Sequence, residues 1–157
     1  ALNEPGTTIV NTRDLTTGET AMHIVTARRD AVWIKFLAQR GANPNIRDKK
    51  GVSPLQLAVT LGFVEGVEAL IKAGAEVEVT DTAGETPLIA AVHRRDVALI
   101  RLLLANRGNP DRTDNSGRSA RDYAKLMTGN SSILAEFDRA DAARKEKGAA
   151  GSYGPGA

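Results

Sequence analysis

Glycine recurs at a fixed interval along most of this chain, at Gly18, Gly51, Gly84 and Gly117. Each is followed two positions later by a hydroxyl residue and then by proline or alanine, as in "GVSP" and "GETP". The interval, about 33 residues, is typical of repeat proteins, in which one small unit is copied and stacked on itself. It therefore constrains the fold more than any other feature of the sequence.

Each repeat is predicted to contain two short helices. Ser53 and Thr86 each precede a proline, and this pair starts a helix because the hydroxyl accepts a backbone amide while proline fits the first turn. Apolar residues at helical spacing then mark a second helix in each repeat. Its apolar stripe is expected at Val32, Trp33, Phe36 and Leu37 in the first repeat, at Val64, Val67, Leu70 and Ile71 in the second, and at Val97, Ile100, Leu103 and Leu104 in the third. Trp33, the only tryptophan, is accordingly expected in the core.

Glycine also marks the ends of the second helices. Gly41 and Gly74 end the first two by supplying a left-handed residue that a side chain would penalise. In the third repeat this position is Arg107, with Gly108 one place later. That helix end is therefore expected to be shifted or slightly strained.

These motifs resemble those of the ankyrin repeat. "GVSPLQLAV" (51–59) and "GETPLIAAV" (84–92) are similar to the family's G-x-T-P-L-x-x-A signature, "GETAMHIVT" (18–26) keeps its histidine, and "GRSARDYAK" (117–125) resembles a terminal repeat. The resemblance covers about residues 6–140. It implies an all-α solenoid of stacked helix-turn-helix units joined by β-turn or hairpin loops, with His23 bridging neighbouring turns by hydrogen bonds. The residues with structural roles would be Gly18, Gly51, Gly84, Gly117, His23, Pro54, Pro87 and Trp33.

The repeat register predicts a single domain over residues 1–147. It would hold a partial repeat at 1–14, then repeats at about 15–47, 48–80, 81–113 and 114–147, followed by a flexible Gly-rich tail at 148–157. Gly6 would end a helix of which only residues 1–4 are present, so Ile24 and Val25 are expected to be partly exposed at a bare end. The final helix, from Ser131 to about Lys147, should be longer and more polar than the others.

Two arginine doublets, in "ARRD" (27–30) and "HRRD" (93–96), fall at the same place in the repeat. Both lie between the first and second helices, where Asp30 and Asp96 can cap the second helix. The second repeat has "GFV" (62–64) there, and glycine is the small residue expected in such a turn. Arg29 and Arg95 are therefore predicted to be solvated turn residues.

Composition argues against several classes of function. The chain has no cysteine and only two histidines, and its 21 basic and 19 acidic side chains give a net charge of +2. Disulfides and thiolate metal sites are excluded, and no apolar run approaches the ~20 residues of a membrane span. No carboxylate pair, nucleophile with base, or metal triad can be assembled around His93. We predict no catalysis, no cofactor, no metal and no small-molecule substrate; the compartment, cytoplasmic or exported, is not indicated.

By resemblance, the chain would bind another protein through a concave surface formed by the turn tips and first helices. Val52 and Leu61 would be apolar anchors, and basic side chains around them would select a partner with an acidic surface. The candidate contact residues are Arg28, Lys49, Lys50, Val52, Leu61, Glu85, His93, Arg94, Asn115 and Arg118.

Two alternatives remain open. The chain could be a structural subunit that docks through its uncapped N-terminal edge. The basic turn residues could instead bind nucleic acid weakly. Acidic residues interspersed among them, the low net charge and the lack of aromatic platforms argue against nucleic acid.

Overall fold

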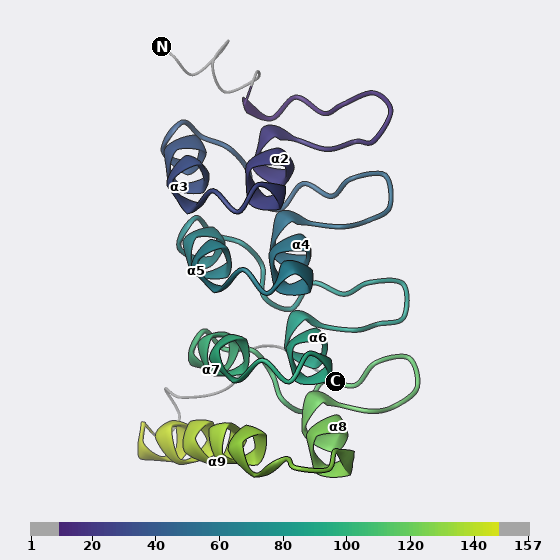
Figure 1. Cartoon of the computed structure of the whole chain (residues 1–157), viewed down its shortest axis with the longest axis vertical. Helices are drawn as coiled ribbons and strands as arrows, with labels where there is room; N and C mark the ends of the chain where they lie inside the picture. The colour runs from purple at the N-terminus through teal and green to yellow at the C-terminus, as the bar shows by residue number, and fades with distance from the viewer. Residues whose placement is uncertain (1–9, 148–157) are drawn as a thin grey trace. The chain divides into compact units, whose positions relative to one another are not determined.

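The computed structural model describes residues 10–147 of the chain, so the tail expected at 148–157 lies outside the described residues. Within residues 10–147 there are eight complete helices, one isolated bridge between Thr113 and Ser119, and no strand (Figure 1). The first helices of the repeats are α2 (Ala21–Ala27), α4 (Pro54–Leu61), α6 (Pro87–His93) and α8 (Ala120–Leu126). The second helices are α3 (Ala31–Gln39), α5 (Val64–Lys72), α7 (Val97–Ala105) and α9 (Ser131–Glu146). The all-α prediction is confirmed.

The chain divides into two compact parts, residues 1–76 and residues 77–157, called here the N-terminal part and the C-terminal part. In the N-terminal part α2 packs on α3 and α4, and both of these pack on α5. In the C-terminal part α6 packs on α7 and α8, and both of these pack on α9. Each part therefore stacks one helix pair on the next, while the single domain over 1–147 stays a prediction.

The first helices begin as the sequence predicts. The Ser53 hydroxyl accepts the Gln56 amide, and the Gln56 side chain accepts the Ser53 amide at 2.7 Å. The Thr86 hydroxyl accepts the Ile89 amide at 3.2 Å, and both helices carry proline in their first turn. These bonds satisfy backbone donors that a helix start would otherwise leave unpaired.

Aspartate caps two of the second helices. The Oδ1 atoms of Asp30 and Asp96 accept the amides of Trp33 and Leu99, each at 3.1 Å. The equivalent residue before α5 is Phe63, whose buried ring covers Gly66 so closely that a Cβ there would lie 2.2 Å from it. Packing takes the place of a polar cap at that helix start.

The arginine doublets have a conformational explanation. Arg29 (φ 59°) and Arg95 (φ 58°) are left-handed, as is Gly62 (φ 67°) at the same place in the second repeat. Both arginines are exposed turn residues, as predicted. Arg29 also donates to the Leu61 carbonyl at 2.5 Å, and Arg95 donates to the Thr128 carbonyl at 2.9 Å. Solvation is therefore only part of their role, because each one ties its turn to the repeat that follows.

Arg107 keeps its helix end in register. Its φ of 70° is left-handed like those of Gly41 (88°) and Gly74 (99°), so the end of α7 is not shifted to Gly108. A residue with a side chain is disfavoured at a left-handed φ. The end of α7 is therefore slightly strained, which is the second of the two outcomes expected from the sequence.

The buried residues of α3 are those equivalent to buried residues in the other second helices, and they differ from the apolar stripe that was predicted for α3 from its own sequence. Buried side chains recur at equivalent positions of the second helices, at Ile34, Val67 and Ile100 and at Leu37, Leu70 and Leu103. Trp33 is 48% exposed and Phe36 is 37% exposed, so the expectation that Trp33 lies in the core is wrong. Ile34 takes the inward position beside it, which turns Trp33 to the neighbouring face of the helix. At the same end Ile24 is exposed and Val25 is half-buried, as expected.

Candidate functional site

The second, third and fourth turn tips are each closed by an aspartate that binds the backbone amides two and four residues later, whereas Asp14 in the first tip binds those of Thr16 and Thr17. Asp48 Oδ1 accepts the amides of Lys50 and Val52, both at 2.9 Å. Asp81 does the same for Ala83 and Glu85, also at 2.9 Å. These aspartate turns hold the tips in one backbone conformation without using the side chains between.

The last aspartate turn carries additional bonds. Asp114 Oδ1 accepts the amides of Ser116 and Arg118 and the Ser116 hydroxyl, and Asp114 Oδ2 accepts the Tyr123 hydroxyl. The Ser116 hydroxyl, followed by that of Tyr123, holds the pKa of Asp114 well below its usual range. Asp114 is therefore a structural anion rather than a free ligand.

Neighbouring tips are joined within the N-terminal part. Lys49 donates its amide to the Thr17 carbonyl at 2.9 Å and its Nζ to the Leu15 carbonyl at 2.5 Å. Buried His23 contacts the Val52 carbonyl through Nε2 at 2.9 Å, while its Nδ1 accepts the Thr20 amide at 3.0 Å. Because Nδ1 accepts, Nε2 must carry the proton and donate. His23 makes the bridge between turns that the resemblance implied.

The N-terminal part places its five candidate residues on adjacent elements. Arg28 and Leu61 lie at equivalent places in successive repeats, at the ends of packed helices α2 and α4. Arg28, Lys49 and Lys50 are exposed, whereas Val52 and Leu61 are half-buried. The arrangement combines apolar side chains with positive charges at accessible positions.

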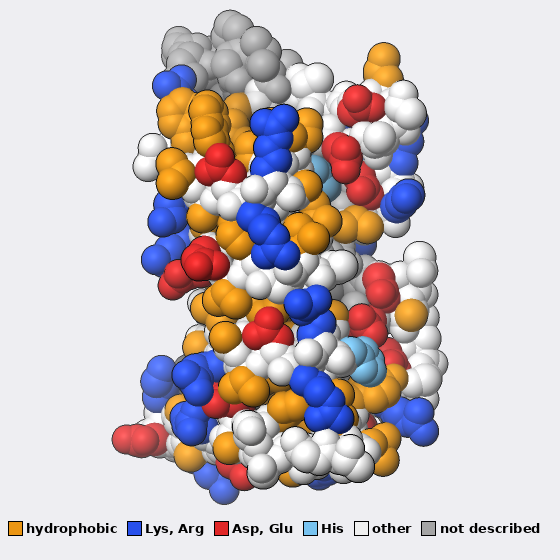
Figure 2. Space-filling view, viewed as in Figure 1, with side chains coloured by type: hydrophobic (Ala, Val, Ile, Leu, Met, Phe, Trp, Pro, Cys, Tyr) orange, Lys and Arg blue, Asp and Glu red, His pale blue; other side chains and the backbone are white. Residues whose placement is uncertain are grey.

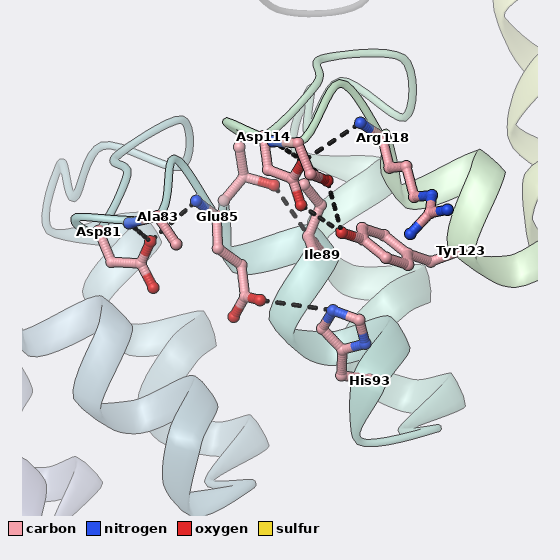
Figure 3. A network of polar contacts seen from close by, with 10 residues as sticks. Asp81, Ala83, Glu85, Ile89, His93, Asp114, Arg118 and Tyr123 are labelled. Atoms are coloured by element: carbon pink, nitrogen blue, oxygen red, sulfur yellow. Dashed lines mark hydrogen bonds and ion pairs between the residues drawn. The ribbon is translucent and has the colours of Figure 1, made fainter.

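The C-terminal part brings Glu85 and His93 together, with Glu85 Oε2 3.4 Å from His93 Nε2 (Figure 3). The Tyr123 ring meets the His93 ring edge to face, with centroids 4.5 Å apart. Burial raises the pKa of Glu85, the charges of Asp81 and Asp114 act in the same direction, and His93 opposes them. The surface around His93 therefore combines a carboxylate, an imidazole ring and a phenol ring, and it is not purely basic.

The remaining candidates differ in exposure and in bonding. Arg94 is the exposed C-cap of α6, and Arg118 is exposed just after the last repeat glycine. Asn115 donates its amide to the Ala83 carbonyl at 2.9 Å and its Nδ2 to the Thr82 carbonyl at 3.0 Å. Asn115 thus helps to hold two turns together as well as lying at an accessible tip.

Tyr123 is a residue of this surface that the sequence analysis did not single out. It stands in α8 at the place that Ala90 occupies in α6, one repeat earlier. The repeat register already put residue 123 on a first helix beside the His93 position. The position of Tyr123 could therefore have been predicted from the repeat register. The hydrogen bond from the Tyr123 hydroxyl to Asp114 could not, because it depends on how the last turn packs against α8.

The described residues give no sign of a metal or membrane site. Residues 10–147 hold no group of three or more histidines, aspartates or glutamates placed to bind a metal ion. No helix in that range is both long and apolar enough to cross a membrane. In Figure 2 basic, acidic and hydrophobic side chains are intermixed on the viewed face of each part, a pattern that does not favour nucleic acid.

Family comparisons agree with these features. A family model described as ankyrin repeats (3 copies) matches residues 2–81, and a second, ankyrin repeats (many copies), matches residues 70–124. The chain belongs to the ankyrin-repeat family. Ankyrin repeats are generally protein–protein interaction modules, and the family is typically non-enzymatic.

Curated relatives are much longer than this ankyrin-repeat chain. It is 35% identical to an ankyrin repeat-containing protein of Treponema pallidum, over 63% of this chain and 33% of the relative. It is 36% identical to the Arf-GAP with coiled-coil, ANK repeat and PH domain-containing protein 2 of Gallus gallus, over 70% of this chain and 16% of that protein. It is 31% identical to the E3 ubiquitin-protein ligase KEG of Arabidopsis thaliana, over 76% of this chain and 8% of the ligase. The matches thus span a third or less of each relative.

Proposed function

We propose that this ankyrin-repeat chain is a non-catalytic module that binds a partner protein through the turn tips and exposed sides of its first helices. The observation that carries the proposal is the set of aspartate turns, which fix the tips through their own backbone amides. A surface held in this way loses little conformational freedom on binding, so more of the interaction energy remains as affinity. Ankyrin repeats generally bind proteins, which supports the same class of partner.

The chemistry of the partner follows from the side chains at these positions. Half-buried Val52 and Leu61 supply apolar side chains, and Arg28, Lys49 and Lys50 add exposed positive charge in the same part. An apolar centre with a charged rim is the usual anatomy of a protein interface. We infer that the N-terminal part selects an apolar segment flanked by carboxylates.

The test is affinity capture from an extract of the source cells, comparing the native chain with a Leu61→Glu, Arg94→Glu double variant. Both substitutions fall at half-buried or exposed helix ends, so circular dichroism should remain native. Lys72→Glu is the matched control, because Lys72 is exposed at the end of a second helix. We expect proteins that are held by the native chain and the control but lost from the double variant. Capture of the same set by all three would refute this surface.

A further inference from the structure

The C-terminal part brings a partly exposed carboxylate next to two aromatic rings. Glu85 lies just before α6, His93 ends that helix, and Tyr123 lies in α8, which packs on α6. The Glu85 carboxylate is 3.4 Å from His93 Nε2, and the rings of His93 and Tyr123 meet with centroids 4.5 Å apart (Figure 3). The side chains of Glu85 and His93 are 30% and 43% exposed, so a ligand can reach both. These three residues are called the Glu85 corner.

The negative charge of the Glu85 corner is not balanced by a permanent positive charge. Within residues 10–147 the ion-pair contact of Glu85 is with His93, and a histidine is positive only when it is protonated. Burial raises the pKa of Glu85, and the charges of Asp81 and Asp114 act in the same direction while His93 opposes them. No lysine or arginine is among the groups that shift this pKa. A cation brought by a ligand would therefore be attracted to the corner.

The aromatic rings indicate which cation suits the Glu85 corner. A guanidinium is planar, binds a carboxylate through two parallel N–H bonds and stacks on aromatic rings, whereas an ammonium is a compact and strongly hydrated charge. A metal ion is not favoured, because the described residues contain no group of three or more histidines, aspartates or glutamates placed to hold one. The combination of carboxylate and rings thus favours an arginine side chain.

An exposed leucine lies next to the Glu85 corner. Leu126 is 68% exposed, and it follows Tyr123 by three residues in α8, a spacing that puts two side chains on the same side of a helix. Leu126 ends α8 as His93 ends α6, so the two residues occupy equivalent places in successive repeats. A ligand whose arginine reaches Glu85 can therefore place an adjacent apolar side chain against Leu126.

We propose that the Glu85 corner binds an arginine side chain of the partner protein, with the guanidinium against Glu85 and Tyr123 and a neighbouring apolar residue against Leu126. This inference rests on the proposed function and adds the chemistry that the partner presents to the C-terminal part. The carboxylate of the corner would repel a phosphate, so the ligand is a protein segment and not nucleic acid.

The test is a titration of the full chain, followed by NMR, with three dipeptides blocked at both ends. They are arginine–leucine, citrulline–leucine and glutamate–leucine, and citrulline has nearly the shape of arginine without its charge. NMR detects the millimolar binding that a single side chain gives. The arginine peptide should shift the resonances of Glu85, His93 and Tyr123 saturably. The citrulline peptide should bind at least about tenfold more weakly, and the glutamate peptide more weakly still.

Variants separate the contributions of charge and apolar contact. Glu85→Gln should abolish the preference for arginine over citrulline, and the turn should persist because it uses the Glu85 amide and not the side chain. Glu19→Gln is the matched control: Glu19 follows Gly18 as Glu85 follows Gly84 and is also half-buried, but α2 ends in Ala27 where α6 ends in His93. Leu126→Ser should weaken the arginine and citrulline peptides by the same factor.

Equal binding of the arginine and citrulline peptides, or no saturable shift with the arginine peptide, would overturn the proposal. An unchanged preference for arginine in Glu85→Gln would overturn it as well. The capture experiment with Leu61→Glu, Arg94→Glu tests the wider surface separately. Loss of captured proteins together with equal peptide binding would leave the proposed function standing and refute arginine recognition. Unchanged capture together with selective arginine binding would support the Glu85 corner and refute the wider surface.

Discussion

Thr26 is fully buried in α2, and its hydroxyl oxygen has no hydrogen-bond partner among the described residues. The equivalent residues one and two repeats later, Val59 and Val92, are buried valines of nearly the same shape. A buried hydroxyl without a partner costs about 1–3 kcal/mol relative to a satisfied one. Valine, which the next two repeats have at this position, is therefore expected to be more stabilising there than threonine.

We expect Thr26→Val to raise the free energy of unfolding by about 1 kcal/mol, because it removes an unpaired polar group and keeps the volume. Urea denaturation followed by circular dichroism measures the change. Thr60→Val is the control, since Thr60 is exposed and its hydroxyl donates to the Gln56 carbonyl at 3.0 Å. A lower midpoint for Thr26→Val would mean that the hydroxyl is satisfied in solution.

Residue roles set by local spacing were predictable, and roles set by tertiary packing were not. Asp30 and Asp96 cap helices that start one residue later, so a short window of sequence contains the whole interaction. The orientation of Trp33 depends instead on which of several adjacent apolar residues faces α2 and α5. Comparing Ile34 with Val67 across the repeats identifies the inward position, whereas a helical stripe taken from one repeat does not.

At the scale of elements, α9 is held against α7 by a buried carboxylate. Glu136 is 4% exposed and accepts two bonds from Arg101, at 2.8 and 3.1 Å, and one from Arg139 at 2.8 Å. The Arg101 hydrogen bonds lower the pKa of Glu136. Because the folded pKa is below the unfolded one, the stabilisation is present above the unfolded value, near pH 4.3, and is lost as pH falls through the folded value.

Glu136→Gln should lower the free energy of unfolding by about 1–2 kcal/mol at pH 7, because a neutral amide binds the arginines less strongly. The difference from the native chain should shrink at pH 3, which lies below the unfolded pKa, because part of the charge-dependent stabilisation is lost there. Urea denaturation at both pH values measures it, with the exposed Glu146→Gln as control. An equal difference at pH 7 and pH 3 would exclude this linkage.

The existence and length of the elements could be predicted better than their contacts. The polar run from Ser131 predicted a long final helix, and α9 indeed extends to Glu146. The pairing of Arg101 with Glu136 joins residues that are far apart in the sequence, and no local pattern marks it. Its geometry depends on how α9 lies along α7.

At the scale of the whole molecule, contacts run from each helix pair to its neighbours within a part. Stability in such an architecture is close to a sum of repeat and neighbour terms. Damage in one part should therefore be felt mainly there.

We expect Leu37→Ala, which removes a buried side chain of α3, to speed amide exchange in residues 10–76 far more than in residues 77–147. Leu103→Ala is the mirror-image control in α7. Hydrogen exchange with mass spectrometry resolves the two parts. A uniform loss of protection along the chain in either variant would indicate one cooperative unit.

The glycine period was enough to predict the repeated helix pairs, because the period and the hydroxyl residue at each helix start are written in every copy. The period says nothing about which faces stay uncovered. Exposure of Trp33 and pairing of Glu85 with His93 arise where the copies differ from one another, so the period alone does not predict them.

The aspartate turns determine which tip residues can be substituted without loss of the fold. Asp48 and Asp81 bind main-chain amides, so the fold makes no use of the side chains of Lys50 and Ala83 that lie inside the turns. Mutations at these positions alter the outer surface while the backbone bonds persist. Natural drift or a randomised library can therefore vary Lys50 and Ala83 almost independently of folding, whereas Lys49 and Asn115 are constrained because their side chains bond neighbouring turns.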